Sequence, residues 1–206
     1  MISWTTITDF GDSAAMLPAA IAIGLWLVIG GAWYRAVVWT LAFTLGTSVV
    51  IASKIAFIGW GYGIRALDFT GVSGHAMLAT AILSAGFYLV GEELRRGIRL
   101  AGVATGMAAG FLIGISRLEL QVHSVSEVMA GCLLGGMVSG LFIAVARHFP
   151  RPVVPAVAGG GALLLLLVTL HGGKAPTQDW ITHLAAALSG QPVPYTRSNW
   201  DRDETM

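Results

Sequence analysis

Long apolar runs alternate with short polar segments over the first 172 residues of the chain. A helix that crosses a lipid bilayer needs roughly 20 mainly apolar residues. By this criterion the chain contains about six candidate transmembrane helices: residues 14–33, 36–57, 75–91, 98–115, 125–146 and 153–171. The third of these is the shortest. The pattern therefore predicts an all-α fold, a polytopic membrane protein built as a bundle of about six spans.

Both ends of the chain depart from this pattern. Residues 1–13 carry spaced apolar positions that predict a segment at the membrane interface: Ile2, Trp4, Ile7 and Phe10. Beyond Gly172 the chain is polar, but apolar residues at helical spacing predict a short amphipathic helix on the membrane surface: Trp180, Ile181, Leu184 and Leu188. We therefore divide the chain into a six-span membrane domain with an N-terminal interfacial segment (residues 1–172) and a polar C-terminal tail (residues 173–206).

Composition supports the membrane assignment. Hydrophobic residues make up 55% of the chain and charged residues only 11%, whereas an ordinary soluble domain has about 25% charged residues. The net charge of +1 gives no reason to expect a nucleic-acid partner. The single cysteine, Cys132, lies inside an apolar run, so the chain offers no intrachain disulfide and no thiolate cluster for a metal.

Basic residues are distributed unevenly over the predicted loops. Six fall in the loops after the first, third and fifth spans, which share one side of the membrane: Arg35, Arg95, Arg96, Arg99, Arg147 and Arg151. Because cytoplasmic loops are enriched in Lys and Arg, we assign that side to the cytoplasm. Both termini and the loops 58–74 and 116–124 then face the periplasm or exterior of a bacterial inner membrane. Three cations on this second side run against the rule and need another role: Lys54, Arg65 and Arg117.

Glycine recurs at every fourth position in two of the predicted spans. In the fourth span the repeat is Gly102, Gly106, Gly110 and Gly114, and the fifth span carries similar pairs. Small residues at this spacing let helix backbones approach closely in lipid. We interpret the repeats as tight packing of these two spans within one chain, in preference to a dimer interface. Such packing would hold the segment between them rigidly.

That segment, residues 116–127, contains an unusual concentration of polar groups. His123 and Glu127 are four residues apart, so in a helix they would lie on one face. A carboxylate bonded to one ring nitrogen fixes the tautomer and leaves the other nitrogen free, as in an activated base or nucleophile. Arg117 adds a planar guanidinium suited to phosphate. A carboxylate near the start of a span is costly without a partner, and His123 is the partner we expect for Glu127.

A second polar cluster directly precedes the third span. Ser73 can cap the helix, and Gly74 leaves the first backbone N–H groups open to bind an anion. His75 would point at the same anion as a proton donor. Lys54, with Arg65 beyond it, adds positive charge at this side. Taken singly, each residue is explained as an ordinary cap or an interfacial side chain, and only their combination favours an anion site. Asp68, Glu119 and Gln121 either line the pocket or are solvated loop residues, and we favour the second interpretation.

These residues resemble a known family. One pattern begins with Ser116–Arg117, continues after five residues with His123, and ends after three more residues with the acid Glu127. It resembles the third signature of the type 2 phosphatidic acid phosphatases, which share their core with vanadium haloperoxidases. Ser73–Gly74–His75 resembles the second signature, and Lys54 the lysine of the first. The resemblance covers roughly residues 54–127. The chain departs from the family pattern at three positions. Glu127 stands where the family usually has Asp, and Val72 stands where it usually has Pro. Gly61 stands at the position of the Arg in an Arg-Pro pair, and Arg65 is the nearest substitute for that Arg.

The resemblance implies a type 2 phosphatidic acid phosphatase-like helical bundle and an integral-membrane lipid phosphate phosphatase that uses a phosphohistidine, with no metal or cofactor. His123 would attack phosphorus, Glu127 would orient it, and His75 would protonate the leaving oxygen. The remaining candidates would hold the phosphoryl oxygens: Lys54, Arg65, Ser73, Gly74 and Arg117. The implied partners are membrane lipids and a lipid phosphate substrate such as phosphatidate, phosphatidylglycerol phosphate or a polyprenyl diphosphate.

Three alternatives stay open at this point. The same core could transfer phosphate between lipids instead of to water. Vanadate-dependent halide oxidation is disfavoured, because such enzymes are typically soluble. A non-enzymatic anion-binding transporter should place its ionisable groups near the bilayer midplane, whereas here they lie at span ends, which favours an enzyme.

Overall fold

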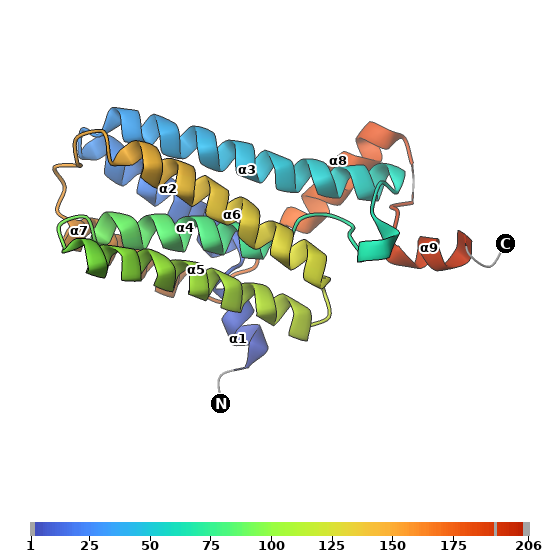
Figure 1. Ribbon diagram of the computed structural model, residues 1–206. Coiled ribbons are helices and arrows are strands. Elements are labelled where there is room, and N and C mark those ends of the chain that lie inside the picture. Colours follow the sequence, from blue (N-terminus) through green and yellow to red (C-terminus); the bar gives the residue numbers. More distant parts are fainter. Residues whose placement is uncertain (1–2, 192, 204–206) are drawn as a thin grey trace.

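The computed structural model describes residues 3–191 and 193–203, and it consists of helices joined by short loops (Figure 1). In chain order the helices are α1 (Trp4–Asp9), α2 (Ser13–Ile29), α3 (Trp33–Trp60), the 3-10 helix η1 (Arg65–Leu67), α4 (Gly74–Val90), α5 (Arg96–Glu119), α6 (Val125–Ala146), α7 (Ala156–Thr169), α8 (Thr177–Ser189) and α9 (Arg197–Asp203). The predicted all-α class is confirmed for the described residues.

Four helical stretches in this part of the chain are long and apolar enough to cross a membrane. They are α1 and α2 together (Trp4–Ile29), α3, α5 and α6. The apolar helices α4 and α7 are shorter, with 17 and 14 residues. Membrane insertion thus agrees with the helices observed, whereas the count of about six spans stays a prediction.

Helix α4 is the centre of the bundle, with buried residues on all of its faces. Glycines of both α5 and α6 contact α4, whereas Gly114 of α5 lies against Val128 of α6, where a Cβ would be 2.7 Å from that side chain. A Cβ on Gly110 of α5 would lie 2.6 Å from the Thr80 Cα atom, and a Cβ on Gly135 of α6 would lie 2.5 Å from the Met77 carbonyl oxygen. The predicted packing within one chain is therefore confirmed. Both α5 and α6 pack mainly on α4, and these contacts fix the three helices relative to one another.

One end of the bundle is held by a buried ion pair. The Arg35 guanidinium contacts the Glu92 carboxylate at 2.7 Å and donates to the Phe149 carbonyl oxygen from its Nε atom at 3.2 Å. The prediction that Arg35 is a loop cation is wrong, because Arg35 lies inside α3, is 2% exposed and is neutralised by Glu92. The basic side of the predicted topology therefore depends on the remaining five arginines, of which Arg96 and Arg99 lie in the first turn of α5 and not in a loop as predicted.

The opposite end gathers the loops and the tail. The residues after α3, those between α5 and α6, and helices α8 and α9 all lie there (Figure 1). The predicted amphipathic helix is present as α8, which packs along the end of α3. A small apolar cluster of Phe57, Ile58, Ala185 and Trp200 joins the tail to α3.

Candidate active site

His123 and Glu127 are in contact at the start of α6. The His123 Nδ1 atom lies 2.6 Å from Glu127 Oε2. Helix α6 begins only at Val125, so this contact crosses the helix N-terminus and is not made along a helical face as expected. A capping box positions it, because Ser124 Oγ accepts from the Glu127 backbone N–H and Ser124 N–H donates to Glu127 Oε2. With Nδ1–H donating to the carboxylate, Nε2 keeps its lone pair.

The Glu127 carboxylate is completely buried and fully hydrogen-bonded. Its second oxygen, Oε1, accepts from the backbone N–H and the hydroxyl of Thr70 at 2.7 and 2.5 Å. Arg197 Nη2 lies 2.9 Å from the same oxygen. These partners explain how a carboxylate is tolerated at 0% exposure. Sequence reasoning missed both Thr70 and Arg197.

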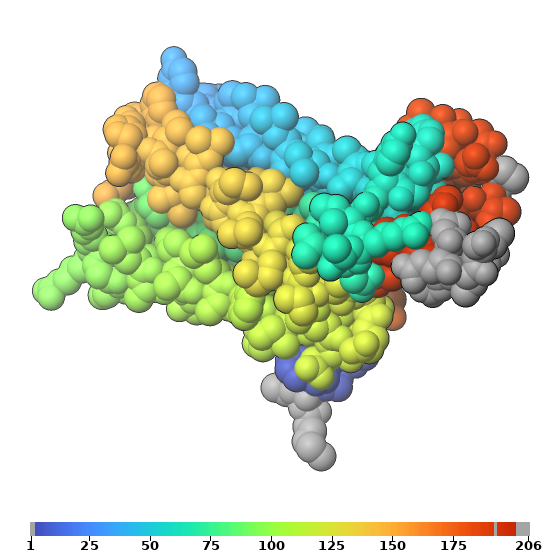
Figure 2. Space-filling view, turned by 45° about the vertical axis from the view of Figure 1, so that its right-hand side comes forward, coloured from blue at the N-terminus to red at the C-terminus, as the bar shows by residue number. Residues whose placement is uncertain are grey.

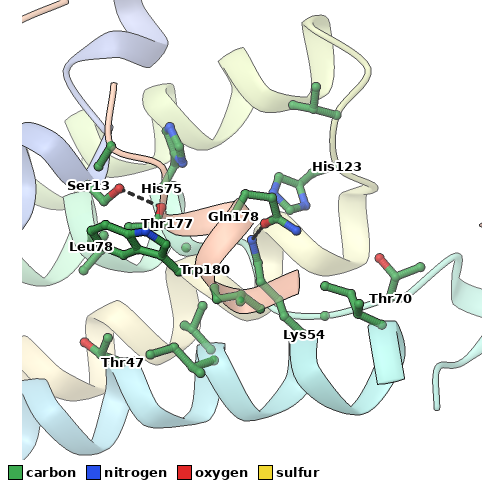
Figure 3. Close-up of a pocket in the computed structure, with 18 of the residues that line it drawn as sticks. Ser13, Thr47, Lys54, Thr70, His75, Leu78, His123, Thr177, Gln178 and Trp180 are labelled. Carbon is green, nitrogen blue, oxygen red and sulfur yellow. Dashed lines mark hydrogen bonds between the residues drawn. The ribbon is translucent and has the colours of Figure 1, made fainter. Parts of the chain in front are cut away.

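Two of the three predicted phosphate cations approach the same cavity from different helices. Lys54, near the end of α3, donates from Nζ to Gln178 Oε1 at 2.9 Å. Arg117, in the last turn of α5, donates from Nη1 to Thr8 Oγ1 at 2.9 Å. Its Nε atom is buried and has no hydrogen-bond partner among the described residues. Figure 3 shows Lys54, Gln178 and His123 grouped in one part of the cavity.

His75 lies in the first turn of α4 and faces a carboxylate that the sequence did not single out. Its Nε2 atom is 3.7 Å from Asp12 Oδ2. Asp12 is itself the N-cap of α2 and accepts from the backbone N–H groups of Ala14 and Ala175 at 2.8 and 3.2 Å. In the sequence, Asp12 stands directly before an apolar helix. That position predicts a helix N-cap and does not predict a contact with His75.

The start of α4 differs from the prediction in one detail. Ser73 occupies the N-cap position but makes no side-chain cap bond, and its buried hydroxyl has no partner among the described residues. Its backbone N–H donates to the Glu127 carbonyl oxygen at 3.1 Å, which ties α4 to α6. Gly74 lines the cavity, whereas Ser73 and Arg65 do not. The Arg65 guanidinium lies 5.9 Å from the Trp200 ring centroid, in the loop region away from His123.

The cavity between these residues has a volume of about 770 Å³. Polar groups from α3, α4, α5 and the loop before α6 form one part of its wall (Figure 3). Apolar side chains form much of the rest: Leu17, Val50, Ile51, Phe57, Leu78, Ile181 and Leu184. One cavity thus combines the cationic side chains of Lys54 and Arg117 with an extended apolar wall.

Comparison with known proteins identifies the family of this chain. Residues 57–151 match the family model of the PAP2 superfamily. A protein of Klebsiella pneumoniae described as an uncharacterized 22.5 kDa protein in the cps region is 38% identical over 207 residues, covering 96% of this chain and 97% of that protein. The chain belongs to the PAP2 superfamily. No solved structure matches it.

Membership in the PAP2 superfamily supports phosphatase-type hydrolysis of phosphate esters. The matched range contains His75, Arg117, His123 and Glu127, and Lys54 lies just before it. The C-terminal tail lies outside the range, although Gln178 and Arg197 reach the site. Among the described residues, no group of three or more His, Cys, Asp or Glu side chains is arranged to hold a metal ion.

The environment of His123 favours its neutral form. Burial lowers the pKa of His123 below its ordinary value, because the imidazolium loses hydration, and the positive charges of Lys54 and Arg117 add to this effect. The hydrogen bond and negative charge of Glu127 act in the opposite direction but do not offset burial. His123 therefore presents an unprotonated Nε2 atom at neutral pH, as a nucleophile requires.

Proposed function

We propose that this PAP2 superfamily protein is an integral-membrane lipid phosphate phosphatase that works through a phosphohistidine. One observation carries the proposal: the His123 ring is held by a buried carboxylate at 2.6 Å and lines a cavity that also contains two cations and an apolar wall. Phosphoryl transfer demands mainly positioning and charge stabilisation, and this arrangement offers both.

The phosphoryl group would bind between α3, α4 and α5. Lys54 and Arg117 supply its countercharges, and the open N–H groups at the start of α4 add donors beside Gly74. The Ser73 hydroxyl and Arg117 Nε are buried donors without partners among the described residues. Buried donors left without partners are costly. Arg117 lines the cavity, so a phosphoryl oxygen bound there would be an acceptor for its Nε atom. Ser73 and Arg65 are the weakest of the candidate phosphate ligands, because neither lines the cavity.

The reaction would proceed in two steps. His123 Nε2 forms a bond to phosphorus while the bond from phosphorus to the lipid oxygen breaks. His75, which becomes protonated when the negatively charged phosphate binds beside it, gives that oxygen a proton. Glu127 stabilises the positive charge that develops on the His123 ring. In the second step His75, now neutral, takes a proton from water as the water oxygen bonds to phosphorus. The phosphorus–nitrogen bond breaks, its electron pair returns to Nε2, and inorganic phosphate leaves.

The apolar wall supports a lipid over a water-soluble phosphate ester. Candidate substrates are phosphatidate, phosphatidylglycerol phosphate and polyprenyl diphosphates. We place the site on the periplasmic or exterior face of a bacterial inner membrane, because the arginines at the start of α5 and after α6 lie at the other end of the bundle. The position of the charged groups at one end of the bundle also favours an enzyme over a transporter.

The test is phosphate release by the purified protein in detergent with a chelator present, over a panel of the three lipid classes. We expect at least one substrate to be hydrolysed, and His123→Ala to abolish the release. His148→Ala is the matched control, because His148 is exposed at the other end of the bundle. Transfer of phosphate to an added lipid alcohol would identify the phosphotransferase alternative. Inactivity on the whole panel, or full activity of His123→Ala, would refute the proposal.

A further inference from the structure

The C-terminal tail, whose structure covers residues 173–191 and 193–203, is docked on the site end of the bundle. Ala175 N–H donates to Asp12, Gln178 accepts from Lys54, and Tyr195 N–H donates to the Ile58 carbonyl oxygen at 2.8 Å. Figure 2 shows the tail against the segment that follows α3. These contacts reach residues on both sides of the cavity, so the tail forms part of the site.

Two aromatic residues fix the part of the tail that contains Arg197. The Tyr195 ring lies over Gly61, where a Cβ atom would be 2.8 Å from the ring and where φ is +73°. Only glycine meets both conditions without strain. On the other side of Arg197, the Trp200 ring lies 5.3 Å from the Phe57 ring in an edge-to-face arrangement. Arg197 is thus placed by contacts on either side of it in the sequence.

The Arg197 guanidinium bridges two carboxylates. Its Nη2 atom lies 2.9 Å from Glu127 Oε1, and its Nε atom lies 3.0 Å from Asp68 Oδ1. Asp68 is largely exposed, whereas Glu127 is completely buried. The guanidinium therefore compensates a buried charge on one oxygen and leaves the other oxygen, Oε2, to His123.

We infer that Arg197 is a positioning residue, which holds the Glu127 carboxylate ionised and oriented so that His123 stays a neutral nucleophile. The inference rests on the proposed function for its consequence in catalysis. Its physical basis is that the two oxygens of one carboxylate have different partners. The positive charge of Arg197 at Oε1 reduces the extent to which Glu127 stabilises a protonated His123 through Oε2. Arg197 does not line the cavity and acts only through Glu127.

The expected effect has a definite sign. Besides Glu127, the charged and titratable groups that face His123 are Lys54 from α3, His75 from α4 and Arg117 from α5. Removing the Arg197 charge leaves Glu127 free to stabilise an imidazolium at His123, so the His123 pKa rises. Because Arg197 is partly exposed, solvent screens its charge, and we expect a rise of roughly 0.5 to 1 pH unit.

The experiment compares the full-length protein with Arg197→Gln and Arg197→Lys in detergent. The first readout is kcat/KM against pH on a hydrolysed lipid phosphate, and the second is the rate of carbethoxylation of His123 by diethyl pyrocarbonate against pH, read by mass spectrometry. We expect both midpoints to move upward in Arg197→Gln and most of the shift to be reversed in Arg197→Lys. Arg147→Gln removes an exposed arginine at the other end of the bundle and should move neither.

Each outcome separates the two proposals. Unchanged carbethoxylation midpoints in a folded Arg197→Gln protein would overturn the role of Arg197, even if the enzyme is active. A shifted midpoint in a protein that hydrolyses no phosphate ester would support Arg197 and refute the proposed function. Should Arg197→Gln fail to fold, Tyr195→Ala loosens the same segment without altering any group bonded to Glu127. An upward shift in that variant supports the inference, and no shift overturns it.

Discussion

Replacing Glu127 by Gln is the substitution with the most informative expected result. The side chain keeps its length, and the three donors around Oε1 determine which end of the amide faces which partner. The two Thr70 donors and Arg197 need an acceptor, so the amide oxygen takes the Oε1 position. The NH₂ group then faces His123 Nδ1 and the Ser124 N–H, where the carboxylate accepted from both.

The consequence for His123 is a change of tautomer. Facing an NH₂ donor, Nδ1 becomes the acceptor, and the ring proton moves to Nε2, the atom that should attack phosphorus. The equivalent Asp-to-Asn change in a Ser-His-Asp triad lowers turnover by about 10⁴-fold, and we expect a loss of about 10³- to 10⁴-fold here. We expect the free energy of unfolding to fall by about 1.5–3 kcal/mol, which is the range for one hydrogen bond to a charged group.

Single-turnover phosphate release measures the chemical step directly, and thermal unfolding in the same detergent reports stability. Glu127→Asp keeps the charge and should lose far less activity than Glu127→Gln, provided that the shorter side chain still reaches His123. The reasoning would be refuted if folded Glu127→Gln kept a tenth or more of the wild-type rate. Equal losses in the Gln and Asp variants would likewise show that side-chain length matters and charge does not.

Three further predictions concern pH, the cavity and packing. The lowered pKa of His123 keeps the ring neutral as pH falls, so the acid limb of kcat/KM should lie below pH 6.5, the ordinary value for histidine; a limb above 6.5 would contradict the assignment. Gln178→Ala frees Lys54 from its bond to the tail and should lower KM with little change in kcat, whereas a raised KM would indicate that Gln178 binds substrate. Gly135→Ala places a Cβ atom 2.5 Å from a backbone oxygen of α4 and should destabilise the bundle by about 1–3 kcal/mol in thermal unfolding. Gly140→Ala, with no neighbouring atom within 4 Å, should be neutral or stabilising, so equal effects would argue against the packing described.

The sequence was sufficient for those parts of the site that are local in the chain. The spacing of His123 and Glu127 predicted their contact, and an acid near the start of an apolar helix required a partner. Connectivity alone placed Lys54, His75 and Arg117 at one end of the bundle, because each lies at the same end of its predicted helix. The hydrophobic pattern located the helices to within a few residues.

The rest of the site depends on contacts between residues far apart in the chain. Thr70 and Arg197 meet Glu127 only because the loop after α3 and the tail fold over the start of α6. Asp12 reads as a helix cap, and its approach to His75 depends on the packing of α2 against α4. Hydrophobic periodicity and residue spacing do not indicate which distant residues come into contact. For this reason the sequence did not predict a role for the C-terminal tail.

The central claim, that His123 becomes phosphorylated, is tested most directly by trapping the intermediate. The protein is mixed with a hydrolysed lipid phosphate, quenched in base within one turnover, digested and analysed by mass spectrometry. We predict one phosphorylated peptide, which contains His123, and no phosphorylated peptide in His123→Ala. Phosphate on a different residue, or wild-type turnover with no phosphorylated protein at any time, would contradict the account.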